Sequence, residues 1–172
     1  MAGPHRHAPP RRRARLALGA AAALSLLLLL AAADARAQGG PGGGGAAFDL
    51  AQYRWTRRVL LLFAPSAGDS SYADEVRAFR SREAEVRERD LVLVSVLEAG
   101  ASAAGDRPLS AADAAALRRR YRAPAGRFTA VLVGKDGHAA LRSGAPIVAD
   151  RLFPTIDAMP MRRAEMRRRG AG

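Results

Sequence analysis

Short runs of apolar residues, separated by polar, glycine-containing or proline-containing stretches, mark the chain from residue 58 onward. The first run, Val59–Phe63, contains no polar residue and is closed by Ala64-Pro65. A continuous apolar run of this length that ends at a proline is typical of a strand buried on both faces. Together with the later runs and a turn, it predicts four strands: Val59–Phe63, Leu91–Leu97, Phe128–Val133 and Ala139–Arg142.

Three other segments carry apolar residues at the spacing of a helix. Their expected positions are about 72–89, about 111–121 and from Asp150 onward. Side chains suited to capping a helix N-terminus stand at their starts: Ser71, Ser110 and Asp150. Pro154 falls inside the third segment, and because proline lacks an N–H we expect an irregular first turn there.

The remaining segments connect these elements. Residues 48–55 place four large apolar residues near helical spacing and predict a short lead-in that packs against the sheet, with Trp55 in the core. Residues 98–108 are mostly small and predict a loop. Lys135-Asp136-Gly137 predicts a hairpin turn, because glycine takes a positive φ without strain.

The resulting order, β-α-β-α-β-β-α, predicts an α/β fold with a mixed sheet. Strands joined through a helix pair in parallel by right-handed crossovers, whereas two strands joined by a tight turn pair antiparallel. Helices are expected on both faces, because continuous apolar strands need cover on both sides.

The N-terminus has the order of a secretory signal peptide. A basic start is followed by an uncharged apolar segment, 16–33, and by Ala35-Arg36-Ala37. This order predicts a signal peptide over residues 1–37, cleaved after Ala37, and a secreted or periplasmic protein. The apolar segment has 18 residues. A helix that spans a bilayer needs about 20, so a membrane anchor at 16–33 is the alternative.

The net charge of +12 is concentrated at the two ends of the chain. Between Gln38 and Met161 the net charge is only +3. A nucleic-acid-binding domain carries its basic residues on the folded part, so we expect no nucleic acid partner. The expected organisation is a signal peptide (1–37), a glycine-rich linker (38–47), a folded domain (48–161) and a basic C-terminal tail (162–172).

Cysteine is absent from the sequence. Its absence removes disulfides, thiolate catalysis and cysteine metal sites together. His138 is the only histidine after the leader, and a metal site needs convergent ligands, so no metal site is expected.

Three stretches of the sequence carry a resemblance to a known family. The first is Asp49-Leu50-Ala51-Gln52-Tyr53-Arg54-Trp55 with the Arg58–Pro65 run that follows, and the second is 128–142 with its Gly-Lys-Asp-Gly turn. The third is Ile156-Asp157-Ala158-Met159-Pro160-Met161-Arg162-Arg163. They resemble a bacterial family, domain of unknown function number 4174, over about 48–167. The resemblance implies a thioredoxin-like, peroxiredoxin-related fold and no particular activity.

Thioredoxin chemistry does not carry over with that resemblance. Aligned after Phe63, the two redox cysteines would fall near Ala67 and Ser70, and neither side chain can form a thiolate or a disulfide. The cis-proline that faces the disulfide in thioredoxins would fall near Phe128. Thiol redox and peroxidase activities are therefore excluded, and we expect no catalytic residues of that kind and no cofactor.

The loop Ser66–Ser71 is the best place in the sequence for a small-ligand site. It lies at the carboxyl end of a central strand and at a helix N-terminus, where open α/β sheets bind ligands and anions are attracted. The candidate ligand-binding residues are Asp69, Ser70 and Ser71. The carboxylate of Asp69 would oppose an anion. A hydrolase triad with His138 can be drawn, but no Gly-x-Ser-x-Gly motif supports it, and capping and turn roles explain the loop better.

The densest positive charge lies in the C-terminal tail: Arg162, Arg163, Arg167, Arg168 and Arg169. One interpretation is a solvated helix end that keeps the protein soluble. The other is contact with an anionic surface, either lipid or cell-surface polymer.

The sequence thus predicts an exported, non-redox thioredoxin-like domain that binds an unknown protein partner or the anionic envelope surface. A membrane is involved only if the leader is uncleaved. The alternative is an enzyme that uses non-cysteine chemistry at the loop after the first strand.

Overall fold

The computed structural model describes residues 47–171. The expected signal peptide and all but the last residue of the expected linker lie outside the described residues. The described elements, in chain order, are η1 (Leu50–Tyr53), β1 (Arg58–Ser66), α2 (Ser70–Ser81), α3 (Glu83–Glu88), β2 (Leu91–Ala99), β3 (Ala103–Ala104), β4 (Arg107–Pro108), α4 (Ala111–Arg120), β5 (Thr129–Val133), β6 (Ala139–Ser143), α5 (Ala149–Asp157) and α6 (Pro160–Gly170).

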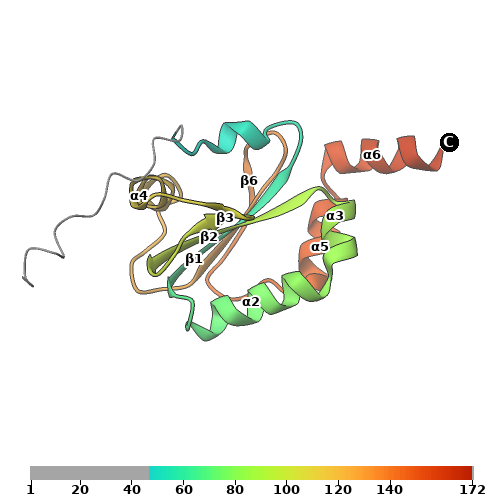
Figure 1. Cartoon of the computed structure of the whole chain (residues 1–172). Coiled ribbons are helices and arrows are strands. Elements are labelled where there is room, and N and C mark those ends of the chain that lie inside the picture. Colours follow the sequence, from blue (N-terminus) through green and yellow to red (C-terminus); the bar gives the residue numbers. More distant parts are fainter. Residues whose placement is uncertain (1–46, 172) are drawn as a thin grey trace, which may run out of the picture. The chain divides into compact units, whose positions relative to one another are not determined.

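The six strands form one mixed sheet in the order β4-β3-β2-β1-β5-β6 (Figure 1). β1 pairs in parallel with β2 through the α2–α3 crossover and antiparallel with β5. β5 and β6 pair antiparallel across the turn at Gly137, whose φ is +86°. The mixed sheet, the central position of the first strand and the hairpin predicted from the sequence are therefore confirmed. The parallel pairing expected for every strand that follows a helix is wrong for β5, which follows α4 and runs antiparallel to β1.

Alternate residues of β1 serve two separate cores, which explains its unbroken apolar run. One set packs under η1 and α4, and the other packs under α2, α3 and α5 (Figure 1). The first set is Val59, Leu61 and Phe63, and the second is Leu60, Leu62 and Ala64. Burying a large aliphatic side chain contributes about 1.5–3 kcal/mol, so each of the buried leucines of this strand contributes substantially to the stability of the fold.

The first predicted helix is two helices. The chain breaks at Arg82, which has φ −120° and ψ 39°, so that α2 ends at Ser81 and α3 begins at Glu83. The predicted apolar stripe is confirmed, because its members all pack in the second core: Tyr72, Val76, Phe79 and Val86. A break that keeps the stripe facing the sheet leaves no trace in the hydrophobic pattern.

Two of the three predicted caps are wrong. Asp69, not Ser71, caps α2, and α5 begins after Val148 rather than at a cap by Asp150. Ser110 does cap α4, since its hydroxyl accepts a hydrogen bond from the backbone N–H of Asp113 at 3.1 Å.

Trp55 lies on the surface, contrary to the core position predicted for it. Its side chain is 61% exposed, and its backbone has φ +67°. The chain reverses between η1 and β1 at this residue, and the N–H of Trp55 donates to the carbonyl of Lys135 at 2.7 Å. The reversal turns the indole outward, and Phe48 and Leu50 supply the buried contacts of the lead-in.

The predicted loop 98–108 contains two short strands. β3 pairs antiparallel with β2, and β4 pairs antiparallel with β3. The hydroxyl of Ser102 accepts a hydrogen bond from the N–H of Leu97 at 2.9 Å and thereby closes the turn between β2 and β3. Strands of two residues carry too few side chains for a periodic pattern to reveal them.

Candidate functional site

A cleft of about 440 Å³ lies at the carboxyl end of β1. Asp69 and Ser71 stand on its α2 side, and Arg127, Thr129 and Arg142 stand opposite them. Two of the three predicted ligand-binding residues therefore face one hollow. Ser70, the first residue of α2, is exposed and does not line it.

The carboxylate of Asp69 is engaged in capping α2. Its Oδ1 accepts a hydrogen bond from the backbone N–H of Tyr72 at 2.9 Å. An N-cap aspartate satisfies one of the free N–H groups of the first helical turn. The side chain of Asp69 is thus held in place by the first turn of α2.

The facing wall of the cleft is cationic. Arg127 is exposed, and no carboxylate of the described residues is paired with it. The guanidinium of Arg142 donates to the carbonyls of Tyr121 at 2.6 Å and of Arg122 at 3.0 Å, which fixes its direction. The cleft is therefore suited to an acidic or hydrogen-bonding partner rather than to a cation.

Neither half of a thioredoxin redox site is present in this cleft. The chain has no cysteine, and Phe128 stands where the cis-proline would fall. Phe128 is buried in the core beneath α2 and α5, and residues 47–171 contain no cis peptide bond. The cleft therefore contains no group capable of thiol chemistry.

His138 lies at the opposite end of the sheet from the cleft. Its carbonyl accepts from the N–H of Gly134 in the β5–β6 turn, and Val133 before that turn pairs with Val59 at the start of β1. Because β1 rises about 3.3 Å per residue, the turn and the cleft are about 20 Å apart. The structure therefore contradicts the hydrolase triad that can be drawn from the sequence.

The amino end of β1 holds a buried cluster of charged side chains that the sequence analysis did not predict. Arg58 is fully buried, and its two terminal nitrogens donate to the carboxylate of Glu165 in α6 at 3.2 Å. Lys135 is also buried, and its Nζ lies 2.8 Å from both Glu165 and Asp90. Each buried cation thus has a carboxylate partner, as the low dielectric of the interior requires.

Arg162 extends the same cluster toward α3 and α5. It is 1% exposed and donates to Asp157 at 3.0 Å and to Glu88 at 2.5 Å. Burial raises the pKa of Asp157, but the hydrogen bonds from Arg89 and Arg162 outweigh it and hold that pKa below its ordinary value. The pKa of Glu165 is lowered in the same way, because the bonds from Lys135 and Arg58 outweigh the effect of burial.

These contacts correct the prediction for the C-terminal arginines. Arg162 cannot contact an anionic surface, because it lies inside the protein. Arg163, Arg167 and Arg168 are exposed, and Arg169 donates to the carbonyl of Glu88 at 3.2 Å. The segment predicted as a tail from residue 162 belongs to α6, which begins at Pro160 and is tied to the sheet through Glu165.

One further buried carboxylate lies away from both ends of β1. Glu75 in α2 is 2% exposed, and it accepts a short hydrogen bond from the backbone N–H of Ile147. Burial raises the pKa of Glu75 to about 7, although the bond from Ile147 opposes the rise. Glu75 therefore joins α2 to the segment before α5, and it does not line the cleft.

Residues 47–171 contain no group of three or more histidine, aspartate and glutamate side chains that could hold a metal ion. Among the same residues, no helix has the length and apolar character needed to cross a bilayer.

The sheet order, the two helical layers and the cleft define a thioredoxin-like α/β domain. A family model described as "Domain of unknown function (DUF4174)" matches residues 49–165, and the chain belongs to that family. The match confirms the resemblance carried by the opening and closing stretches of the sequence.

Solved structures share this fold at low sequence identity. A 2-Cys peroxiredoxin of Plasmodium vivax is 16% identical, with a TM-score of 0.53 over 68% of this chain and 72% of that one. Thioredoxin peroxidase I of Plasmodium yoelii is also 16% identical, with a TM-score of 0.51 over 67% of this chain and 79% of that one. StoA from Bacillus subtilis is 14% identical, with a TM-score of 0.42 over 58% of this chain and 81% of that one. The two peroxidases establish the likeness in fold alone.

Proposed function

We propose that this chain is an exported, non-redox thioredoxin-like module that binds a partner protein through the cleft at the carboxyl end of β1. The observation that carries the proposal is the cleft itself. It keeps about 440 Å³ of open space and a cationic wall, and the chain contains no thiol to react there.

The charges of the cleft favour an acidic segment of the partner. Arg127 has no carboxylate partner among the described residues, and Arg142 is fixed by two backbone carbonyls. The one carboxylate in the cleft, Asp69, already accepts a hydrogen bond from α2. An incoming carboxylate would therefore meet exposed guanidinium groups, which favour planar, bidentate contacts.

The test begins with affinity capture from an envelope extract, using the full chain with an affinity tag. A captured protein is identified, purified and titrated against the wild-type chain, Arg127→Glu and the control Arg119→Glu. Arg119 is an exposed arginine of α4 that does not line the cleft. Loss of affinity in Arg127→Glu alone supports the proposal. Equal binding by all three chains would place the partner elsewhere.

A second candidate is adhesion to an anionic envelope surface through α6. Arg163 and Arg167 are four residues apart and exposed, so they share one face of the helix. Each basic residue near an anionic membrane contributes about 1 kcal/mol. Binding to vesicles that contain anionic lipid should weaken in Arg163→Ala/Arg167→Ala and with added salt, and binding that survives both changes rejects this role.

Export rests on residues outside the described part of the chain, and the mature N-terminus tests it. Cleavage after Ala37 yields a protein that begins at Gln38, and its mass identifies it directly. A retained leader would instead give the membrane-anchored form, with residues 16–33 in the bilayer.

An enzyme with non-cysteine chemistry is the remaining alternative, and Ser71→Ala should abolish its turnover without changing the melting temperature.

A further inference from the structure

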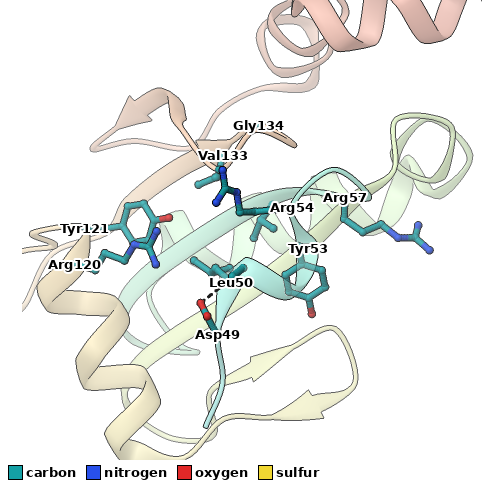
Figure 2. A pocket seen from close by; sticks show the side chains of 12 residues that line it. Asp49, Leu50, Tyr53, Arg54, Arg57, Arg120, Tyr121, Val133 and Gly134 are labelled. Carbon is teal, nitrogen blue, oxygen red and sulfur yellow. Dashed lines mark hydrogen bonds between the residues drawn. The ribbon is translucent and has the colours of Figure 1, made fainter. Parts of the chain in front are cut away.

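A second pocket, separate from the cleft, lies between η1 and the end of α4 (Figure 2). Its volume is about 180 Å³. Leu50, Val59 and Val133 give it apolar walls, and Arg54, Arg120 and Tyr121 supply polar groups. A protein cavity of about 150 Å³ can hold benzene, so the space is sufficient for a molecule of about one ring.

The side chain of Arg54 is positioned by its neighbours on two sides. Its guanidinium carbon lies 5.3 Å from the centre of the Trp55 ring, at a distance typical of a cation–π contact. Its stem packs against Gly137, where a Cβ would come within 3.4 Å of the Arg54 Nε. Figure 2 shows the guanidinium directed toward Val133 and Tyr121, whereas Arg57 points away from them.

Arg120 and Tyr121 stand across the pocket from η1. The guanidinium carbon of Arg120 lies 5.7 Å from the centre of the Tyr121 ring. Burial raises the pKa of Tyr121 above its ordinary value, although Arg120 opposes the rise, so the hydroxyl stays protonated and can donate. The end of α4 therefore offers the pocket one cation and one neutral donor.

These groups have no anionic partner in the described part of the chain. Arg54 and Arg120 make the ring contacts above, and neither forms an ion pair with any of residues 47–171. The carboxylate of Asp49, which also lines the pocket, accepts a hydrogen bond from the N–H of Ala51 at 2.9 Å and caps η1. Two guanidinium groups and a phenol thus face a space with apolar walls and one engaged carboxylate.

We propose that this pocket binds a small organic anion, with a carboxylate or phosphate group on a body of about one ring. The anionic group would accept hydrogen bonds from Arg54, Arg120 and the Tyr121 hydroxyl. The body would lie against Leu50, Val59 and Val133. Trp55 and Gly137 act as positioning residues, because they hold Arg54 in its direction across the pocket.

Titration of the full chain with four ring-sized probes tests the assignment by calorimetry and by NMR. Benzoate and phenyl phosphate represent the two anionic groups, and benzyl alcohol and benzylamine are the neutral and cationic counterparts. We expect saturable binding of at least one anion, with the counterparts at least about tenfold weaker, since hydrogen bonds to charged groups are the strong ones. Tighter binding of benzoate would indicate a carboxylate ligand, and tighter binding of phenyl phosphate would indicate a phosphate ligand.

Variants locate the binding site. Arg54→Ala and Arg120→Ala should each weaken binding about tenfold, and the control Arg119→Ala should leave it unchanged. Arg54 and Arg120 are exposed, so the melting temperature should stay near that of the wild type and report that the fold is intact. Unaltered affinity in the Arg54→Ala/Arg120→Ala chain, equal binding of benzyl alcohol, or no saturable binding of either anion would overturn the proposal.

Discussion

The two ends of β1 differ in where the chain places its charges. At the carboxyl end, Asp69, the one carboxylate that lines the cleft, caps α2, and the lining arginines, Arg127 and Arg142, are exposed. At the amino end, Arg58 and Lys135 are buried and share the carboxylate of Glu165. Shifted pKa values in a cleft point to catalysis. Here the carboxylate with the lowered pKa, Glu165, lies at the amino end of β1, where its ion pairs attach α6 to the sheet.

The composition of α6 explains why that attachment uses charges. α5 presents buried apolar side chains to the sheet, Leu152 and Ile156, but the only fully buried side chain of α6 is Arg162. A helix without an apolar stripe cannot be held by the hydrophobic effect. Buried ion pairs give directional contacts instead, and they stabilise the fold only while every partner is present.

The largest expected effect comes from removing the shared carboxylate. Glu165→Ala leaves Arg58 and Lys135 buried without that partner, and breaking a buried pair in this way costs about 3–5 kcal/mol. Urea unfolding followed by circular dichroism measures the loss. Arg163→Ala, an exposed change on the same helix, should shift stability by no more than about 0.5 kcal/mol. A loss below 1 kcal/mol in Glu165→Ala would show that α6 detaches without unfolding the domain.

A smaller effect, with a defined pH dependence, is expected at Glu75. Because its pKa is raised to about 7 from 4.5, the folded state binds the proton more tightly than the unfolded state does. Its contribution is fully present below pH 4.5 and is lost as the pH rises through about 7. The loss is on the order of 3 kcal/mol, because the pKa difference of about 2.5 corresponds to 1.36 kcal/mol for each pKa unit.

Glu75→Gln tests that dependence. The variant keeps an oxygen acceptor for the N–H of Ile147 but cannot ionise, so its stability should fall less than that of the wild type between pH 4.5 and pH 8. Glu83→Gln is the matched control, because Glu83 is exposed on the adjacent helix and should follow the wild-type curve. Parallel curves for the wild type and Glu75→Gln would contradict the raised pKa.

The sheet was predictable from the sequence because its strands are buried on both faces. Each residue of Val59–Phe63 lies in one of the two cores, so the apolar run reflects the fold directly. The cleft was predictable in position, because the carboxyl end of a central strand is where open sheets form clefts. The roles of its residues were harder to predict, because several neighbouring polar side chains could cap α2 and the geometry selects Asp69.

The buried charges could not be predicted from local patterns. Arg58 lies next to an apolar strand and Arg162 lies in an arginine-rich segment, so composition places both at the surface. Arg58 is buried against Glu165, which is 107 residues away along the chain, and Arg162 is buried against Glu88, which is 74 residues away. The prediction for Trp55 was wrong in the opposite direction. The size of the side chain suggests burial, but a backbone reversal turns it outward. The only signal for Arg58 and Arg162 was that both lie in the stretches that resemble the family.

The smallest effect concerns the carboxyl end of β1 and separates capping from ligand binding. Asp69→Ala should destabilise the protein by about 1 kcal/mol, because the N–H of Tyr72 loses its acceptor. Asp69→Asn should restore most of that stability, since asparagine caps helices as well as aspartate does. Ser71→Ala should change stability by less than about 0.5 kcal/mol. Thermal unfolding of the three variants provides the measurement. If Ser71→Ala lost as much stability as Asp69→Ala, Ser71 would contribute to the cap of α2, as the sequence pattern predicts.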